Sequence, residues 1–389
     1  MVKKEKWLIG CLIAILVVIS LVMGCAPKAA PTTPTKPTTP TKPTAPAPTQ
    51  TVQVPPKPSM IKLLVASIGD ATFLNMAGIS AKATETTKIP WRILPKGASI
   101  PKLAELKVGT GDFAALSESA VYGIMHGLHE FNDPDWGPQD LRLAWTGGLY
   151  TSSPFTQADS GIRTGKDMVG AKVAWTQALG AAKFNLDSGT WAFFGYDYAN
   201  KDPRMEYIIL LGLQELTAAG LEARRYTLYN MSPRSARAYD MSGASCGLQF
   251  INMPPDDKEG WARLHEYIPF VDPYLMQPGE GAAITEPTYV MSYAYNVAGY
   301  PDSVDDSKVY WVTKGIWDSF DLYKDLHPDL KYYSHERCLE YEGWKMPWYD
   351  ASIKFFKEMG VWTPEMDRRQ VELKEELKNT IATWKYKPE

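Results

Sequence analysis

Short apolar runs alternate with amphipathic stretches from residue 61 onward. The first run, Ile61–Ala66, is apolar at all positions but Lys62 and predicts a buried strand. The same pattern predicts strands over residues 61–66, 91–94 and 113–116, with helices over residues 73–87, 100–106 and 117–125. Strands that alternate with helices indicate an α/β fold with a mainly parallel sheet.

A second block repeats this alternation. Strands are predicted over residues 172–175, 225–229 and 248–251, helices over residues 205–219 and 233–239, and a charged amphipathic helix over residues 367–384. Two α/β blocks predict two lobes with a cleft between them. Ligands of such sheets bind beyond the carboxyl ends of strands, where helix N-termini point. The loops at residues 69–73, 96–99, 117–119, 176–179 and 231–232 are therefore candidate binding loops.

The N-terminus has the parts of a secretory signal. Basic Lys3, Lys4 and Lys6 precede an uncharged apolar run over residues 7–23, which stops at Gly24-Cys25. The alternative is an uncleaved membrane anchor, because the run is near the length that spans a bilayer. Residues 22–25, Val-Met-Gly-Cys, resemble the bacterial lipobox, which implies removal of residues 1–24 and lipidation of Cys25. We therefore expect an exported protein anchored by lipid at the membrane, facing the periplasm or the cell exterior.

Residues 26–58 are rich in Pro and Thr and offer almost nothing to bury, so we expect an extended linker. The whole chain has 41 basic and 44 acidic residues; residues 1–58 hold seven Lys and one Glu, leaving 34 against 43 in the rest. This acidic balance disfavours nucleic acid as a partner. Cys246 and Cys338 are the cysteines outside the N-terminal segment, and the sequence leaves open whether they pair.

Two motifs suggest chemistry. Residues 243–247, Gly-Ala-Ser-Cys-Gly, fit the nucleophile elbow around Ser245, but the predicted helix lies before the serine and the strand after it, the reverse of the required order. His126, His129 and Glu130 are neighbours without a distant fourth ligand, which makes a poor zinc site. We expect no metal, no cofactor and no enzyme activity; a serine hydrolase using Ser245 is the alternative from a different class.

Several segments resemble the TAXI family of solute receptors, which serve TRAP transporters. They are Gly97 to Leu103, Gly111-Asp112-Phe113, Ser160-Gly161-Ile162, Val309-Tyr310 with Thr313-Lys314, and Pro347 to Gly360. The resemblance covers roughly residues 61–365, and the order of the segments is its most specific feature.

The resemblance implies a two-lobed type II periplasmic-binding-protein fold with a helical C-terminal region. We expect lobe 1 over residues 59–160, lobe 2 over residues 161–278, and a return to lobe 1 with C-terminal helices over residues 279–389. The implied function is capture of a small organic solute and its delivery to a TRAP permease. A receptor for an ABC importer is the alternative of the same class.

The binding residues follow from the matches and from departures within the matched loops. We expect ligand contacts in lobe 1 and in lobe 2 from Thr72, Phe73, Ser99, Lys102, Ser117, Ser119, Thr176, Gln177, Ser232 and Arg234. Lys102 stands where the family has a neutral Asn, and Phe73 stands in a loop that has lost its glycines. A cation beside helix N-termini favours a negative group. We therefore expect a carboxylate on an aromatic or apolar body rather than the amino acids or dicarboxylates expected of the family.

Overall fold

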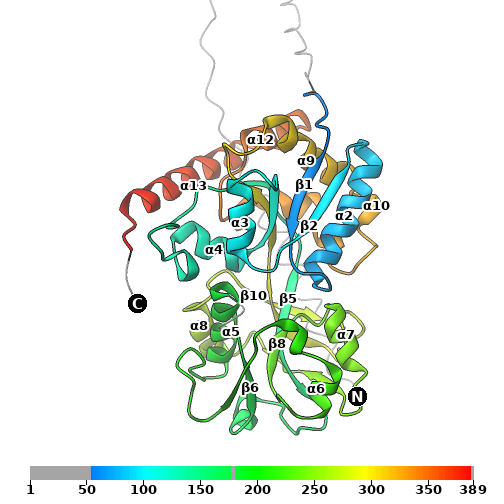
Figure 1. Cartoon of the computed structure of the whole chain (residues 1–389), viewed down its shortest axis with the longest axis vertical. Helices are drawn as coiled ribbons and strands as arrows, with labels where there is room; N and C mark the ends of the chain where they lie inside the picture. Colours follow the sequence, from blue (N-terminus) through cyan, green and yellow to red (C-terminus); the bar gives the residue numbers. More distant parts are fainter. Residues whose placement is uncertain (1–53, 177–179, 387–389) are drawn as a thin grey trace, which may run out of the picture. The chain divides into compact units, whose positions relative to one another are not determined.

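The computed structural model describes residues 54–176 and 180–386. The predicted signal, Cys25 and most of the predicted linker lie outside this range. The described residues belong to one unit that contains two separate main sheets, and we call each sheet with its helices a lobe. Figure 1 shows the elements of both lobes.

Lobe 1 contains a five-stranded sheet in the order β2-β1-β3-β12-β4. Its strands are β1 (Ile61–Val65), β2 (Trp91–Pro95), β3 (Phe113–Ser117), β4 (Arg142–Trp145) and β12 (Tyr295–Gly299). Strands β2, β1 and β3 are parallel, and β12 runs antiparallel to both β3 and β4. In β1 every side chain except that of Lys62 is buried, as expected of a strand covered on both faces.

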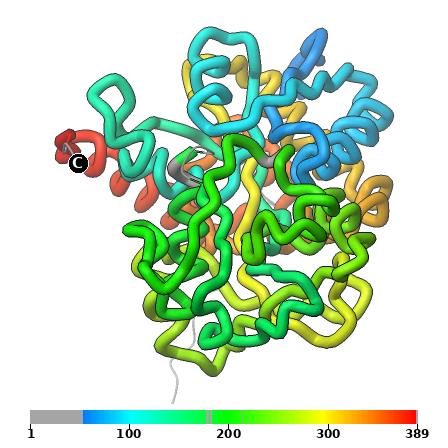
Figure 2. The backbone as a smooth tube through the Cα atoms, turned by 60° about the horizontal axis from the view of Figure 1, so that its bottom comes forward, coloured from blue at the N-terminus to red at the C-terminus, as the bar shows by residue number. Residues whose placement is uncertain are grey.

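Helices from both ends of the chain surround this sheet. They are α2 (Ala71–Thr87), α3 (Ser99–Lys107), α4 (Glu118–His126), α9 (Asp306–Asp318), α10 (Phe320–Tyr323), α11 (His335–Cys338), α12 (Asp350–Glu358) and α13 (Pro364–Thr383). Trp384, just after α13, donates from its indole nitrogen to the carbonyl of Gly127 at 3.0 Å. Figure 2 shows this end of the chain beside the segment that follows α4.

Lobe 2 is built on an antiparallel sheet in the order β10-β11-β5-β8, with β9 also paired to β5. The strands are β5 (Tyr150–Gln157), β8 (Tyr229–Met231), β9 (Leu248–Phe250), β10 (Asp272–Met276) and β11 (Thr288–Tyr293). A separate parallel pair joins β6 (Lys172–Trp175) and β7 (Glu206–Ile209). The helices are α5 (Ala181–Phe193), α6 (Ala218–Glu222), α7 (Ala236–Ser242) and α8 (Lys258–His265).

The chain crosses between the two sheets at residues 146–149, after β4, and at Ala294, between β11 and β12. Gly147 and Gly148 occupy the first crossing with φ of +139° and +49°, and an added Cβ on Gly148 would lie 2.7 Å from the ring of Tyr333. At the second crossing, the Ala294 amide donates to Glu118 Oε2 at 3.0 Å, and the Glu118 amide donates to the Ala294 carbonyl at 3.1 Å. Burial raises the pKa of the Glu118 carboxyl to about 7.

The predicted two-lobed α/β fold with a helical C-terminal region is confirmed. Three details were wrong. The strand predicted over residues 225–229 is β8 at Tyr229–Met231. The sheet is mainly parallel only in lobe 1, and residues 205–219 form β7, a 3₁₀ turn and the start of α6 instead of one helix. The predicted lobe boundaries at residues 160 and 278 do not coincide with the crossings between the two sheets, which lie at residues 146–149 and at Ala294.

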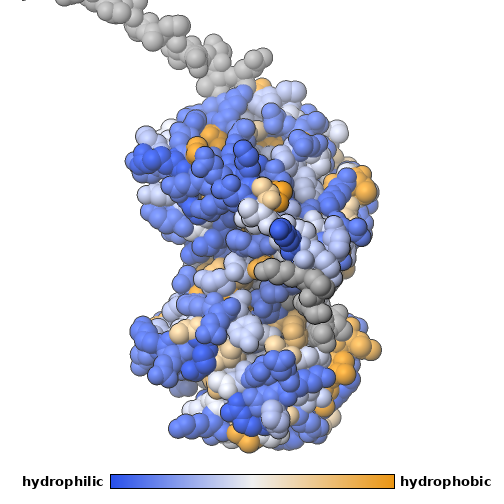
Figure 3. All heavy atoms as spheres, turned by 90° about the vertical axis from the view of Figure 1, so that its left-hand side faces the viewer, coloured by the Kyte–Doolittle hydropathy of each residue, from blue (hydrophilic) through white to orange (hydrophobic). Residues whose placement is uncertain are grey.

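No helix in the described part of the chain is long and apolar enough to cross a membrane. The face in Figure 3 is mainly hydrophilic, with apolar residues scattered over both lobes.

Candidate functional site

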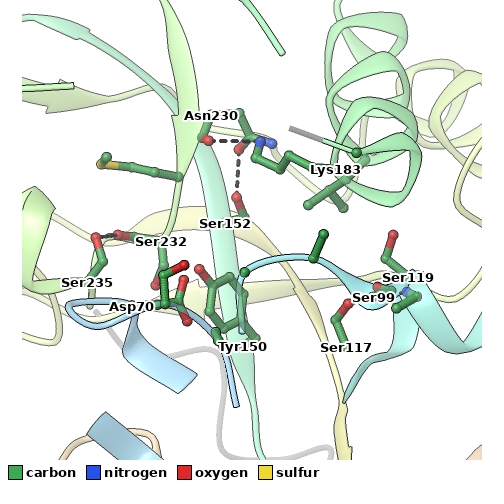
Figure 4. A pocket seen from close by; sticks show the side chains of 18 of the residues that line it. Asp70, Ser99, Ser117, Ser119, Tyr150, Ser152, Lys183, Asn230, Ser232 and Ser235 are labelled. Carbon is green, nitrogen blue, oxygen red and sulfur yellow. Dashed lines mark hydrogen bonds between the residues drawn. The ribbon is translucent and has the colours of Figure 1, made fainter. Parts of the chain in front are cut away.

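A cavity of about 500 Å³ lies between the lobes and takes its lining from both of them. The lobe 1 side is formed by the loops that follow β1, β2 and β3, and the lobe 2 side by β5, the end of β8 and the start of α5. In lobe 1 these positions are the carboxyl ends of parallel strands, where α/β proteins usually bind their ligands. Figure 4 shows the polar side chains that line the cavity.

Three helices of lobe 1 begin at the cavity. Asp70 caps α2 by accepting from the Thr72 amide at 2.8 Å, and Ser117 caps α4 by accepting from the Ala120 amide at 3.2 Å. Ser99 is the first residue of α3, whose N-cap residue Ala98 provides no side-chain cap. The unpaired amide groups of a helix N-terminus favour negative groups. This wall therefore suits an anionic or strongly hydrogen-bonding end of a ligand.

Lys102 is the basic side chain of this wall and is 4% exposed. Its Nζ donates to the Ala115 carbonyl on β3 at 2.9 Å, and it forms no ion pair with any described residue. Burial lowers the pKa of Lys102 to about 8, and the nearby charge of Asp70 opposes that shift. A buried ammonium with one protein hydrogen bond retains donors for a ligand oxygen.

The lobe 2 wall is held by a buried polar network centred on Asp187, which is 1% exposed. The carboxylate of Asp187 forms an ion pair with Lys183 and accepts from Thr176 Oγ1 at 2.5 Å and from Asn230 Nδ2 at 3.0 Å. Asn230 in turn accepts from Ser152 Oγ at 2.7 Å. Lys183, Asn230 and Ser152 line the cavity, as Figure 4 shows, whereas Asp187 lies behind them. The charge of Lys183 is therefore already balanced.

Four tyrosines contribute aromatic surface to the cavity: Tyr150, Tyr229, Tyr293 and Tyr295. The ring of Tyr150 lies 5.2 Å from that of Tyr293 and 5.8 Å from that of Tyr295, between centroids. Burial raises the pKa of all four phenols, so their hydroxyls stay protonated and can donate hydrogen bonds. Tyr150, Tyr293 and Tyr295 flank the two chain crossings, which places this aromatic surface where the chain passes between the sheets.

The hydroxyl of Tyr229 is buried and has no hydrogen-bond partner among the described residues. An unsatisfied buried polar group costs about 1–3 kcal/mol. Because Tyr229 lines the cavity, a ligand oxygen is a physically reasonable partner for this hydroxyl.

The structure brings five of the predicted binding residues together. Ser99, Lys102, Ser117 and Ser119 line the cavity from lobe 1, and Ser232 lines it from lobe 2. Gln177 lies outside the described residues. That any of these residues binds a ligand stays a prediction.

Four other predicted residues do not line the cavity. Thr72 is buried at the second position of α2, and Phe73 packs against the lobe 1 core. Thr176 is buried, and its hydroxyl donates to Asp187, the residue that also forms an ion pair with Lys183. The Arg234 side chain is 0% exposed and is ion-paired to Asp329 at 2.8 Å.

Sequence reasoning missed Lys183, Asn230, Ser152 and three of the four tyrosines. Asn230 could have been predicted from the sequence, because it lies two residues before the predicted Ser232 at a strand end. Tyr293 and Tyr295 flank Ala294, but nothing local marks that residue as a crossing between sheets. Trp175 and most aromatic residues of 191–198 lie in a core of lobe 2 and do not line the cavity.

The candidate features for catalysis lie elsewhere. Ser245 lies in the turn between α7 and β9, where its amide donates to Glu222 Oε1 at 2.5 Å, and it does not line the cavity. The helix precedes the serine, as the sequence predicted. Cys246 and Cys338 are separate free thiols, in lobe 2 and lobe 1 respectively. Among the described residues, no cluster of three or more His, Cys, Asp or Glu side chains could hold a metal ion.

No protein-family model and no curated protein sequence matches the chain. Among solved structures, the chain is similar to periplasmic binding protein BugD at 9% identity and a TM-score of 0.46, over 82% of this chain and 97% of that one. It is also similar to the alkanesulfonate-binding protein SsuA from Xanthomonas axonopodis pv. citri, bound to MOPS (12%, TM-score 0.41, 85% and 92%). A third is a TRAP periplasmic solute-binding protein from a Sulfitobacter species with bound β-D-galacturonate (12%, TM-score 0.37, 83% and 95%). At this identity the likeness is one of fold.

Proposed function

We propose that this protein is an extracytoplasmic receptor that captures a small organic solute between its lobes and delivers it to a membrane transporter. The observation that carries the proposal is the cavity itself, because both lobes line it and it contains a buried tyrosine hydroxyl without a partner. A cavity of about 500 Å³ falls in the range that holds small molecules. Closure of two lobes around such a site is a common way to bind a solute.

The proposed solute is a carboxylate on an aromatic or apolar body. Lys102 provides a buried cation without an acidic partner, and Ser99 and Ser117 lie beside it at helix N-termini. The tyrosines provide a partly aromatic surface for the apolar body of the solute. Arg234 is not part of this proposal. Its guanidinium is ion-paired with Asp329 and is therefore not available to bind the carboxylate of a solute.

The proposed transporter is a TRAP permease, and the proposed family is TAXI, on the basis of the ordered sequence segments between residues 61 and 365. A receptor for an ABC importer is the alternative. Export and a lipid anchor at Cys25 are part of the same proposal, because a receptor must meet its permease at the membrane. Catalysis by Ser245 receives no support from its position outside the cavity.

Calorimetry on the full chain tests the solute class. We expect an aromatic monocarboxylate from a panel of benzoate and phenylacetate derivatives to bind, and glutamate and succinate to bind far more weakly. Lys102→Ala removes a charge-assisted contact worth about 1.5–3 kcal/mol, so affinity should fall about 10- to 100-fold. Tyr229→Phe should weaken binding without destabilising the unliganded protein, because its hydroxyl has no partner there.

Lys82→Ala is the matched control, because Lys82 is a surface lysine of α2 that pairs only with Glu85. Affinity should be unchanged in this variant. Tight binding of glutamate or succinate, with no response to any aromatic acid, would contradict the proposed solute. Turnover of activated esters that disappears in Ser245→Ala would instead favour the hydrolase.

A further inference from the structure

One buried ion pair joins the two lobes beside the cavity. Arg234 follows β8 in lobe 2, and its Nη1 lies 2.8 Å from Asp329 Oδ1 in the C-terminal part of lobe 1. The two side chains are 0% and 1% exposed. The buried charges of Arg234 and Asp329 thus form a direct contact between the two lobes.

Lobe 2 fixes the orientation of the Arg234 guanidinium. Its Nε donates to the Glu280 carbonyl at 3.1 Å, and its Nη2 donates to the Tyr274 hydroxyl at 3.3 Å. Tyr274, on β10, also shares a hydrogen bond of 2.5 Å with the Tyr332 hydroxyl of lobe 1. The guanidinium therefore reaches lobe 1 already oriented by its own lobe.

Lobe 1 holds Asp329 in the same way. The amide of Asn75, on α2, donates to Asp329 Oδ2 at 3.3 Å, which leaves Oδ1 for Arg234. The neighbouring Leu330 is buried in the lobe 1 core. Both partners are thus placed by their own lobes, and the ion pair forms only when the lobes meet.

The pair also connects to the cavity wall. The Arg234 amide donates to Ser232 Oγ at 3.2 Å, and Ser232 lines the cavity. Separation of Arg234 from Asp329 would therefore move a wall of the cavity away from lobe 1.

We propose that Arg234 and Asp329 form a latch that holds the lobes closed when no solute is bound. Removing Arg234 leaves the Asp329 carboxylate buried without its cation, and removing Asp329 leaves Arg234 with Glu280 Oε2, at 3.5 Å in its own lobe, as its anionic partner. Either change disfavours the arrangement that buries the pair. In this protein that arrangement is the closed one, since opening returns the remaining charge to water. The latch concerns the empty protein and holds whichever solute the cavity takes.

Hydrogen exchange of the full chain without solute tests the latch. The reporter amides are those of residues 232–236 and 277–282, which lie around the pair and outside the strands. In Asp329→Asn their exchange should become faster by on the order of 100-fold. Amides of β1 and β11, within the two lobe cores, should keep their wild-type protection, because each lobe stays folded.

Two further variants make the test decisive. Arg234→Met should give the same local increase while Asp329 keeps Asn75 as a partner, so it serves where Asp329→Asn fails to accumulate. Arg234→Met combined with Asp329→Leu removes both charges and should return exchange to within about threefold of wild type. Arg225→Gln is the matched control, because it breaks an ion pair with Glu215 inside lobe 2 and should leave the reporter amides unchanged.

Two results would overturn the latch. Wild-type exchange of the reporter amides in both single variants would mean that the pair does not hold the lobes together. Loss of protection that spreads equally to β1 and β11 would mean that the pair supports folding rather than closure.

Discussion

Lys102, Lys183 and Arg234, which are three of the basic side chains near the cleft, have different environments. Lys183 is balanced by Asp187, Arg234 by Asp329, and Lys102 donates only to a backbone carbonyl. Sequence reasoning treated Lys102 and Arg234 as equivalent candidates for a carboxylate, because both follow predicted binding loops. Their partners are distant in sequence, so only the folded structure separates the two roles.

Glu118 gives stability an unusual dependence on pH. Burial raises the pKa of its carboxyl from 4.5 to about 7, so the folded protein holds this proton more tightly than the unfolded chain. The resulting stabilisation is fully present below about pH 4.5 and is lost as pH rises through about 7. A shift of this size corresponds to about 3 kcal/mol.

Chemical denaturation of wild type and Glu118→Gln between pH 4.5 and 8 checks this expectation. Gln keeps an oxygen that can accept from the Ala294 amide but cannot ionise. The variant should therefore gain stability relative to wild type by about 3 kcal/mol across this range. Parallel curves for the two proteins would show that Glu118 titrates near its ordinary value.

Part of the site could be predicted at the residue level. Ser99, Ser117 and Ser119 line the cavity, and each lies where a predicted strand passes into a helix. That they bind a ligand stays a prediction. The tyrosines at the crossings were missed, since their position depends on pairing between β5 and β11, which are far apart in sequence. Thr176 is also at a strand end, but its hydroxyl is directed to Asp187.

At the level of elements, strongly periodic segments were predicted well and short ones were not. The strands and helices of residues 61–126 lie within about two residues of their predicted ends. Residues 205–219 were predicted as a helix, but Tyr207 and Ile208 instead pair with β6 in a parallel ladder. A short apolar run is compatible with a helix or a strand. Here the pairing with β6 stabilises the strand.

The first crossing between the sheets depends on Gly148. An alanine there would adopt a φ of +49° and would place its Cβ 2.7 Å from the ring of Tyr333. Left-handed strain of about 1–2 kcal/mol and overpacking of about 1–3 kcal/mol should together destabilise the protein by about 2–5 kcal/mol. Urea denaturation of Gly148→Ala measures this loss.

Gly360→Ala serves as the control for Gly148→Ala. Gly360 lies in the same lobe with a φ of +72°, and its added Cβ would meet nothing within 4 Å. It should lose only the strain contribution of about 1–2 kcal/mol. Equal losses in the two variants would mean that Tyr333 moves aside at no cost.

For the whole molecule, alternation of strands and helices was enough to predict two lobes. It could not predict that lobe 2 is antiparallel, because β5, β8 and β9 are joined by long segments that resemble crossovers in sequence. Helices α9 to α13 contribute to the core of lobe 1, whereas β11, which the prediction placed in the returning segment of residues 279–389, belongs to the sheet of lobe 2.

Attachment of the whole protein to a membrane is predicted to depend on Cys25, which lies outside the described residues. Expressed in a bacterium, the wild-type protein should partition into the detergent phase, because several acyl chains on one cysteine give stable anchoring. Cys25→Ser should partition into the aqueous phase or remain as the precursor. Equal partitioning of both proteins into detergent would contradict lipidation and favour a retained N-terminal helix.

The insertion of β12 between β3 and β4 has a consequence for the order of folding. Lobe 1 begins with β1 at residue 61, but its sheet is not continuous until residues 295–299 are available. All strands of lobe 2 precede those residues in the chain. A chain that is synthesised from its N-terminus can therefore complete lobe 2 first. Strands β1 to β3 are available early, but β12, which pairs with β3, appears only at residues 295–299. Such long-range pairing is slow, so lobe 1 becomes compact only some time after residues 295–299 have appeared.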